Sequence, residues 1–211
     1  MRRLLIATTN PAKLAEYRLI LRDIELDLVS LAEVGITGVP EELGATFEEN
    51  ALIKARFYFE QVRTATLADD GGLEIDALGG EPGVRSHRWL NSGGDDSDQA
   101  LVNEVIRRMK GVPSGRRTAR LRAATALIYD HDGLVRERIA AAAIEGVIAE
   151  RAYPQLRAGF PYRAVLFMPE RNCFVGELGD QEEAKISQRR IALGRLHDDL
   201  VRIAAGGRGR L

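Results

Sequence analysis

Two neighbouring aspartates, Asp69 and Asp70, stand at the end of an apolar run and are followed at once by Gly71 and Gly72. Carboxylates are oxygen ligands of the kind that Mg²⁺ prefers, and glycines let a ligand or a second backbone segment come close. Adjacent side chains of an extended strand point to opposite faces, so both carboxylates can serve one site only if the strand ends there. We therefore expect one carboxylate in a site and the other held by backbone or by a neighbouring helix, with a simple tight turn as the alternative.

A second polar segment lies where the strand expected over residues 3–7 gives way to a helix that begins at Pro11. Its side-chain donors are Thr8, Thr9 and Asn10. A helix N-terminus offers unpaired N–H groups and the positive end of the helix dipole, which suit a phosphate, and Lys13 follows one turn into the helix. The spacing is not that of a Walker A loop. Taken alone, a capped helix with a surface lysine is the simpler interpretation.

A third segment places acidic residues before a helix that carries a lysine. Glu41 and Glu42 precede the helix, and Lys54 lies about two turns into it. A solvated acidic loop with an exposed lysine is the ordinary interpretation. The functional interpretation makes Glu42 and Asp70 a pair of metal ligands and Lys54 a phosphate contact, and it leaves a contribution from Glu41 open.

Together the three segments supply a helix N-terminus, two lysines, two carboxylates and a glycine turn. These groups are the parts that phosphoanhydride cleavage needs, because positioning and charge neutralisation supply most of its catalysis. A carboxylate that orients a water molecule can also take its proton.

Helical and strand patterns alternate in the first part of the chain, and a hairpin follows. We expect strands over residues 3–7, 26–31, 64–69 and 164–168, a hairpin over 120–146 with its turn at Asp132 and Gly133, and helices from Pro11, after Thr46, over 99–112 and over 181–204. This order favours an α/β fold with a mixed sheet. Residues 1–205 are expected to form one domain, and residues 206–211 a flexible tail.

The composition is that of an ordinary globular protein. Of 211 residues, 45% are hydrophobic and 29% charged, with a formal net charge of −1. Nothing in these totals indicates a nucleic-acid partner or a membrane surface. No run approaches the ~18 apolar residues of a membrane span. The single cysteine, Cys173, cannot form an internal disulfide, so a cytoplasmic location is expected.

Three stretches closely resemble the inosine/xanthosine triphosphate pyrophosphatases, which remove non-canonical purine nucleotides. They read ATTNPAKLAEY, EELGATFEENALIKAR and ADDGGLEIDALGGEPGVRS. The match is dense from residue 6 to about residue 89 and remains collinear to about residue 196. The resemblance implies an elongated two-lobed α/β fold with a cleft between the lobes, usually as a homodimer. It also implies Mg²⁺-dependent hydrolysis of a nucleoside triphosphate to the monophosphate and pyrophosphate, with water attacking the α-phosphate.

The family's roles carry over by position. Asp70 matches the catalytic base and a metal ligand, Glu42 a metal ligand, and Lys54 and Lys13 the phosphate contacts, of which Lys54 is counted as catalytic. Thr8, Thr9 and Asn10 match the phosphate turn. Two positions depart from the family, because Gly71 stands where serine is usual and Thr9 where glycine is usual.

The larger departures lie in the segments that read the base. The family's G-F-G-Y-D-P becomes Gly-Phe-Pro-Tyr-Arg-Ala over residues 159–164, so Phe160 and Tyr162 remain to stack on or wall a base while Arg163 replaces an acidic residue. Pro161 removes a backbone donor. In the family's E-K-x-x-I-S-H-R, Glu183 takes the lysine position and Gln188 the histidine position, whereas Ser187 and Arg189 are kept.

These changes predict an active pyrophosphatase with an altered base preference, since a hydrogen-bonding pocket rejects a base that leaves its polar groups unpaired. A standard house-cleaning ITP, XTP and dITP pyrophosphatase is one alternative. A catalytically silent nucleotide-binding module is a second. A related nucleotide phosphatase of the Maf type is a third, which the paired second and third motifs disfavour.

Overall fold

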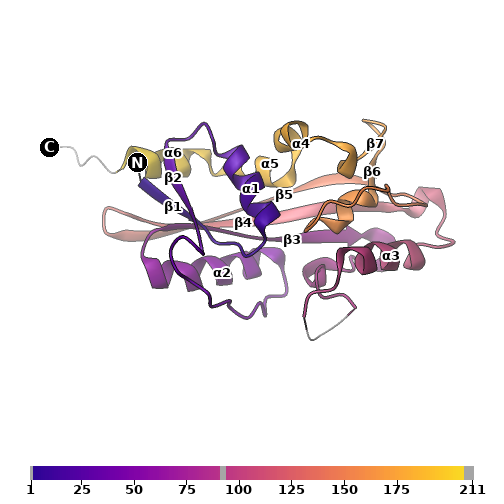
Figure 1. Cartoon of the computed structure of the whole chain (residues 1–211), viewed down its shortest axis with the longest axis horizontal. Helices are drawn as coiled ribbons and strands as arrows, with labels where there is room; N and C mark the ends of the chain where they lie inside the picture. Colours follow the sequence, from indigo (N-terminus) through magenta and orange to yellow (C-terminus); the bar gives the residue numbers. More distant parts are fainter. Residues whose placement is uncertain (1, 91–93, 207–211) are drawn as a thin grey trace. The chain divides into compact units, whose positions relative to one another are not determined.

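The computed structural model describes residues 2–90 and 94–206 and shows an α/β protein (Figure 1). Seven strands form one mixed sheet in the order β2-β1-β3-β4-β5-β6-β7, as the predicted fold class requires. The strands are β1 (Arg2–Ile6), β2 (Leu26–Ser30), β3 (Ala65–Ile75), β4 (Thr118–His131), β5 (Leu134–Ile148), β6 (Leu166–Met168) and β7 (Cys173–Phe174). The helices are α1 (Pro11–Ile20), α2 (Phe47–Val62), α3 (Asp98–Arg108), α4 (Asp180–Ile186), α5 (Gln188–Arg195) and α6 (His197–Ala205).

The chain divides into two compact units. Unit 1 comprises Met1–Asp70, Ala123–Ala142 and Arg189–Leu211, and unit 2 comprises Gly71–Arg122 and Ala143–Gln188. Strands β3, β4 and β5 each supply residues to both units. The expected single domain over 1–205 stays a prediction, and of the expected tail all but Gly206 lies outside the described residues.

Unit 1 begins with a parallel arrangement in which β1 pairs with both β2 and β3. The buried residues Leu4, Leu5 and Ile6 of β1 explain why the apolar run forms a strand. The predicted helix starts are confirmed: the Asn10 side chain caps α1, and Thr46 Oγ1 accepts a hydrogen bond from the Glu49 N–H at the start of α2. The predicted hairpin of β4 and β5 is also confirmed, and Asp132 and Gly133 adopt the positive φ angles that a type I′ turn requires.

Strand β3 does not end at the aspartates. It continues through both aspartates and both glycines to Ile75, so the expected end at residue 69 is wrong. Gly72 has a packing reason within unit 2, since a Cβ there would lie 1.8 Å from Ser86 Oγ. That hydroxyl accepts from the Leu73 N–H at 3.0 Å and donates to the Gly83 carbonyl at 2.6 Å. The glycine therefore admits a side chain from a following turn and does not break the strand.

The helix expected over 181–204 is also wrong as one element, because the structure has three short helices there. Ser187, between α4 and α5, is extended with ψ 151° and is fully buried. Leu196 separates α5 from α6 with ψ 6°. The first break falls beside the boundary between the two units, between Gln188 and Arg189.

The core of unit 2 contains the apolar face of α3 and its C-cap residue: Leu101, Val105 and Met109 are fully buried. On the same helix Glu104 accepts hydrogen bonds from Arg107 and Arg108, each at 2.7 Å. The hydrogen bond from Arg107, helped by Arg108 and opposed by burial, lowers the pKa of Glu104 to about 2.

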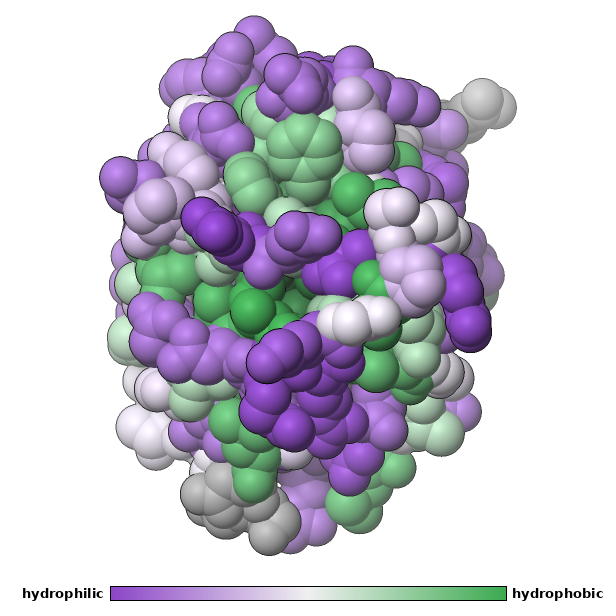
Figure 2. Space-filling model, turned by 90° about the vertical axis from the view of Figure 1, so that its right-hand side faces the viewer, coloured by the Kyte–Doolittle hydropathy of each residue, from purple (hydrophilic) through white to green (hydrophobic). Residues whose placement is uncertain are grey.

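Figure 2, which views the right-hand side of Figure 1, shows hydrophilic residues bordering apolar ones on that face. No described helix is long and apolar enough to cross a membrane.

Candidate functional site

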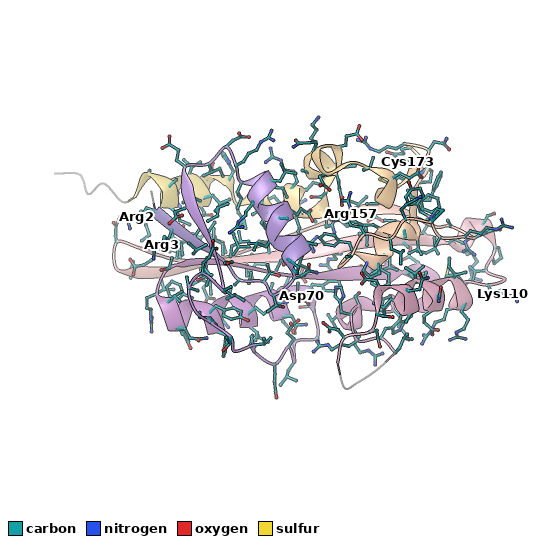
Figure 3. All side chains as sticks on the ribbon, in the orientation of Figure 1. Arg2, Arg3, Asp70, Lys110, Arg157 and Cys173 are labelled. Atoms are coloured by element: carbon teal, nitrogen blue, oxygen red, sulfur yellow. The ribbon has the colours of Figure 1, made fainter. Side chains whose placement is uncertain are left out.

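The predicted carboxylates and one predicted lysine of unit 1 are in direct contact. Lys54 Nζ lies 3.2 Å from Glu42 Oε2 and 3.2 Å from Asp70 Oδ1. Asn50 Nδ2 donates to the second oxygen of Asp70 at 3.1 Å. We call these four residues the carboxylate–lysine cluster; Asp70, labelled in Figure 3, is its member on β3. The side chains of Lys54 and Asp70 are each only 11% exposed, so their charges act on each other with little screening by water.

The cluster is built by one face of α2 and by the close contact of the Gly44 backbone with Asn50. Asn50 and Lys54 lie four residues apart on α2 and therefore point to the same side. Asn50 is held in turn by the Gly44 N–H, which donates to its Oδ1 at 2.8 Å. A Cβ at Gly44 would fall 2.6 Å from that oxygen, so only glycine fits there. Asn50 thus fixes both the loop that carries Glu42 and the carboxylate of Asp70.

The second aspartate contacts a different set of residues. Asp69 Oδ2 lies 3.2 Å from Lys13 Nζ and 3.0 Å from Arg189 Nε, and Arg189 also contacts Glu16 at 3.3 Å. Burial disfavours the charged form of Asp69, but Lys13 and Arg189 outweigh it and hold the pKa of this carboxyl far below its usual range. Asp69 is therefore the carboxylate held by neighbouring helices, the division of roles expected from strand geometry.

Of the four groups expected to converge, Glu42, Asp70 and Lys54 are in contact, and Lys13 contacts Asp69 beside them. Burial lowers the pKa of Lys54, but Asp70 and Glu42 offset this and leave its pKa above its usual value. Both interpretations that treated Lys13 and Lys54 as exposed surface lysines are wrong, because as whole residues they are only 8% and 9% exposed.

The charge balance of unit 1 provides a test of whether a divalent cation fits. The contacting groups comprise three cations, Lys13, Lys54 and Arg189, and four carboxylates, Glu16, Glu42, Asp69 and Asp70. One negative charge is in excess, so these groups alone would repel a polyphosphate. Mg²⁺ commonly binds one or two carboxylates and keeps waters and phosphate oxygens as its other ligands. Glu42 and Asp70 fit that need, and within the described chain no group of three or more His, Cys, Asp or Glu side chains offers a more complete site.

The phosphate turn has the local geometry of a capped helix. Asn10 Oδ1 accepts from the Ala12 N–H at 2.9 Å and from the Lys13 N–H at 3.2 Å. Thr8 Oγ1 accepts from the Asn10 N–H at 3.2 Å, while Thr9 is exposed. The cap holds the turn between β1 and α1, and the predicted contacts of these three residues with phosphate stay predictions.

Unit 2 brings together the residues that depart from the family pattern. Arg163 Nε lies 2.6 Å from Glu183 Oε1, and the two side chains are 4% and 3% exposed. The guanidinium of Arg163 also lies 3.4 Å from the centre of the Phe160 ring. A second guanidinium, that of Arg157, hydrogen-bonds Glu183 and donates to the Leu178 carbonyl at 3.0 Å. The two positions at which the family motifs carry Asp and Lys therefore hold the opposite charges and form a buried ion pair.

The other base-segment residues are buried in unit 2. Tyr162 is 4% exposed, and its hydroxyl donates to the Ser86 carbonyl. Burial raises the pKa of Tyr162 well above its usual value. Gln188 is 5% exposed, and its Oε1 has no hydrogen-bond partner among the described residues. A buried acceptor left without a donor is costly, so this oxygen is suited to receive a donor from a ligand.

Sequence reasoning missed Asn50, although its i, i+4 spacing from Lys54 was available as a signal. It also did not link Glu183 to Arg163, because twenty residues separate them and no local pattern connects them. Gly71 begins unit 2 on β3, and its expected contact with substrate stays a prediction.

The fold and the cluster define an α/β protein with buried paired carboxylates and lysines. The Ham1 family model matches residues 4–199, so the chain belongs to the Ham1 family, and the predicted resemblance is confirmed. The chain is 39% identical over 196 residues to the dITP/XTP pyrophosphatase of Bacillus subtilis, covering 93% of this chain and 96% of that protein. It is 39% identical over 201 residues to the dITP/XTP pyrophosphatase of Xylella fastidiosa, covering 95% and 98%.

Solved structures agree with this assignment. A HAM1 protein from Coxiella burnetii matches with a TM-score of 0.80 and 32% identity, covering 95% of this chain and 98% of that chain. The nucleoside-triphosphatase, or dITP/XTP pyrophosphatase, of Mycobacterium abscessus matches with a TM-score of 0.71 and 34% identity, covering 92% and 98%. The chain is thus a member of a family of enzymes.

Proposed function

We propose that this chain is a Mg²⁺-dependent nucleoside triphosphate pyrophosphatase with an altered base preference. The reaction converts a nucleoside triphosphate and water to the monophosphate and pyrophosphate. The observation that carries the proposal is Lys54 held at 3.2 Å from each of two carboxylates, Glu42 and Asp70. The names of the curated relatives support the reaction class.

In this proposal the residues of unit 1 bind the triphosphate. Bound at Glu42 and Asp70, Mg²⁺ supplies positive charge that offsets the excess carboxylate and the phosphate oxygens. Lys54 and Lys13 neutralise phosphate charge, while Thr8, Thr9 and Asn10 orient the phosphates at the start of α1. Asp70 takes the proton of the water that attacks the α-phosphorus, and the bond to the bridging oxygen breaks as pyrophosphate leaves. Asn50 keeps the Asp70 carboxylate oriented.

The altered base preference is proposed from unit 2. The reversed ion pair of Arg163 and Glu183 is buried and compensated, which favours a rebuilt pocket over random drift. Phe160 and Tyr162 provide aromatic surface for the base, and Gln188 offers a buried amide to its polar edge. Gly71 and Arg189 complete the proposed substrate contacts.

The first experiment asks whether the chain is catalytic. Pyrophosphate release is measured with ITP and Mg²⁺, before and after EDTA, and in the Asp70→Asn variant. We expect release to require Mg²⁺ and to fall at least a thousandfold in the variant while nucleotide binding persists. Binding without release in the wild-type protein, tested across a nucleotide panel, favours the silent binding module instead.

A second experiment tests the base preference. Values of kcat/KM are compared for ITP, XTP, dITP, the four common nucleotides and purines with exocyclic amino groups. A best substrate outside ITP, XTP and dITP supports the proposal. Strong and selective hydrolysis of ITP and XTP returns the chain to the standard house-cleaning function.

The assembly and location are also proposals. We expect a homodimer in the cytoplasm, a nucleoside triphosphate as the partner and neither nucleic acid nor membrane binding, as the near-zero net charge and single cysteine suggest. Light scattering coupled to gel filtration gives the mass and tests the dimer directly.

A further inference from the structure

Unit 1 contains a cavity of about 220 Å³ that the proposed reaction does not use. Its lining residues come from the start of β1, the end of α2, the start of β3, the end of β4 and the last turn of α6. They are Arg2, Arg3, Arg63, Thr64, Ala65, Tyr129, Asp130, His131, Arg202, Ile203 and Gly206. We call this space the arginine cavity. Arg2 and Arg3, which are labelled in Figure 3, lie at the start of β1 and line it. Four guanidinium groups line it against one carboxylate, so its electrostatic character is cationic.

Two of the four arginines are already paired with carboxylates. Arg3 Nε lies 3.4 Å from Asp27, and Arg202 Nη1 lies 2.9 Å from Asp199. Within the described part of the chain, neither Arg2 nor Arg63 has a carboxylate within ion-pair distance. Arg63 lies over the Phe59 ring at 5.7 Å, a contact that leaves its N–H groups able to donate. The cavity thus holds two cations without an acidic partner.

The arginine cavity is separate from the carboxylate–lysine cluster within unit 1. Ala65 lines the cavity and Asp70 belongs to the cluster, and both lie on β3. Five residues of extended strand span about 17 Å. Arg2 and Arg3 start β1, whereas the phosphate turn at Thr8 follows its end. A ligand in the cavity would therefore be distinct from the triphosphate.

The size and donors of the cavity select the ligand class. A volume of about 220 Å³ lies below the ~300–1,000 Å³ of pockets for drug-sized ligands. Guanidinium groups present paired N–H donors that match phosphate oxygens. We propose that the arginine cavity binds a small anion with phosphate-type oxygens, no larger than pyrophosphate, through Arg2 and Arg63.

Gly206 contributes a steric feature that makes the proposal testable. A Cβ at this position would lie 2.9 Å from Arg2 Nε and 3.0 Å from Arg2 Nη2. The guanidinium therefore rests directly on the glycine backbone. A methyl group there must displace Arg2 without removing any charge. Because Gly206 has φ +59°, alanine also strains the backbone, so only the pyrophosphate-dependent rise in Tm, and not the Tm itself, reports on Arg2.

Isothermal titration calorimetry with inorganic pyrophosphate, in EDTA, tests the site. The wild-type protein is compared with Arg2→Gln/Arg63→Gln and with the charge control Arg116→Gln/Arg136→Gln, which removes two arginines that do not line the cavity. We expect binding to weaken at least tenfold in the first variant and to stay within twofold in the control. The Lys13→Ala variant, which removes a cation of the proposed triphosphate site, should retain the arginine-cavity binding. Orthophosphate and AMP, tested in parallel, separate a free inorganic anion from the phosphate of a nucleotide.

Thermal unfolding gives a readout that a purely structural role would not change. Arg63 and Arg202 lie near helix C-termini, where a cation stabilises a helix without any ligand. If this were the whole role of Arg63, Arg63→Lys would keep the stabilising charge, and the rise in Tm on adding pyrophosphate would be the same as in the wild type. On the proposal, Arg63→Lys and Gly206→Ala each reduce the rise in Tm that pyrophosphate produces.

Any one of three results overturns the proposal: the wild-type protein shows no pyrophosphate binding at low ionic strength, Arg2→Gln/Arg63→Gln binds pyrophosphate as well as the wild type, or the charge control loses as much binding as Arg2→Gln/Arg63→Gln. None of these outcomes bears on pyrophosphatase activity, since Arg2 and Arg63 lie outside the proposed machinery. Nucleotide hydrolysis in the double variant, without added anion, should match the wild-type rate.

Discussion

The buried ion pair of unit 2 gives a prediction whose size can be worked out. Glu183 is held by Arg163 and by Arg157, so Glu183→Gln leaves two guanidinium groups facing each other around a neutral amide. Removing one partner of a buried pair typically destabilises a protein by about 3–5 kcal/mol. Arg163→Gln leaves Glu183 still paired with Arg157, so we expect a smaller loss of about 2 kcal/mol.

The double variant should lose less than the two single losses combined, because Arg163 and Glu183 are then both neutral and Arg157 keeps its ion pair with Asp180 at 3.1 Å. We expect a coupling energy of about 2 kcal/mol, which is roughly a thirtyfold change in the unfolding equilibrium. Urea unfolding followed by circular dichroism measures all four corners of the cycle. The matched control is the exposed pair of Arg56 and Glu137, whose atoms lie 2.7 Å apart at 54% and 36% exposure. That pair should couple by no more than about 1 kcal/mol.

Additive losses at Arg163 and Glu183 would refute the interpretation that the two family departures are one compensated change. If Arg163→Gln were instead as damaging as Glu183→Gln, the expected support of Glu183 by Arg157 would be refuted. For the base preference, the cycle is repeated with kcat/KM for ITP and for the best substrate. A selectivity that shifts by about tenfold or more links the pair to base discrimination.

Three further predictions follow from contacts described above. Asn50→Ala removes the donor to Asp70 and should lower kcat about 10–100-fold with a smaller change in KM, measured by steady-state pyrophosphate release. Gly72→Ala places a methyl group on the serine hydroxyl beside it and should destabilise by about 3 kcal/mol, whereas Gly194→Ala, in open space on α5, should be neutral or stabilising by about 0.5–1 kcal/mol in urea unfolding. The folded-state pKa of Glu104 lies below its unfolded value near 4.5, so the ion pairs of Glu104 stabilise the protein above that pH. Glu104→Gln should therefore be less stable than the wild type by about 1 kcal/mol at pH 7, and this difference should vanish as the pH falls towards 2.

Local features of the sequence predicted the start of unit 1 well. The polar turn before Pro11, the cap at Thr46 and the hairpin turn at Asp132 are set by residues within a few positions of each other, so their chemistry is visible in the sequence. The family motifs added the carboxylates and lysines. Their contact at 3.2 Å requires α2 and β3 to pack together, which no local pattern encodes.

The failures have one physical cause. Paired glycines indicate a turn when only neighbours are considered, yet β3 continues because Ser86 packs against Gly72 from fourteen residues away. Likewise the apolar spacing over 181–204 is helical, but an extended, buried Ser187 interrupts it. In both places a contact made in three dimensions overrides the local preference.

The continuing strand also answers the question raised by the adjacent aspartates. Because β3 does not turn, the two carboxylates point to opposite faces of the strand and contact different residues. Asp69 contacts Lys13 and Arg189, and Asp70 contacts Lys54 and Asn50. A carboxylate held by two buried cations is poorly suited to change its charge during a reaction, whereas one held by a single lysine and an amide can exchange ligands. The pair therefore supplies one fixed anion, Asp69, that holds α1 and α5, and one anion, Asp70, that is free to bind the proposed metal.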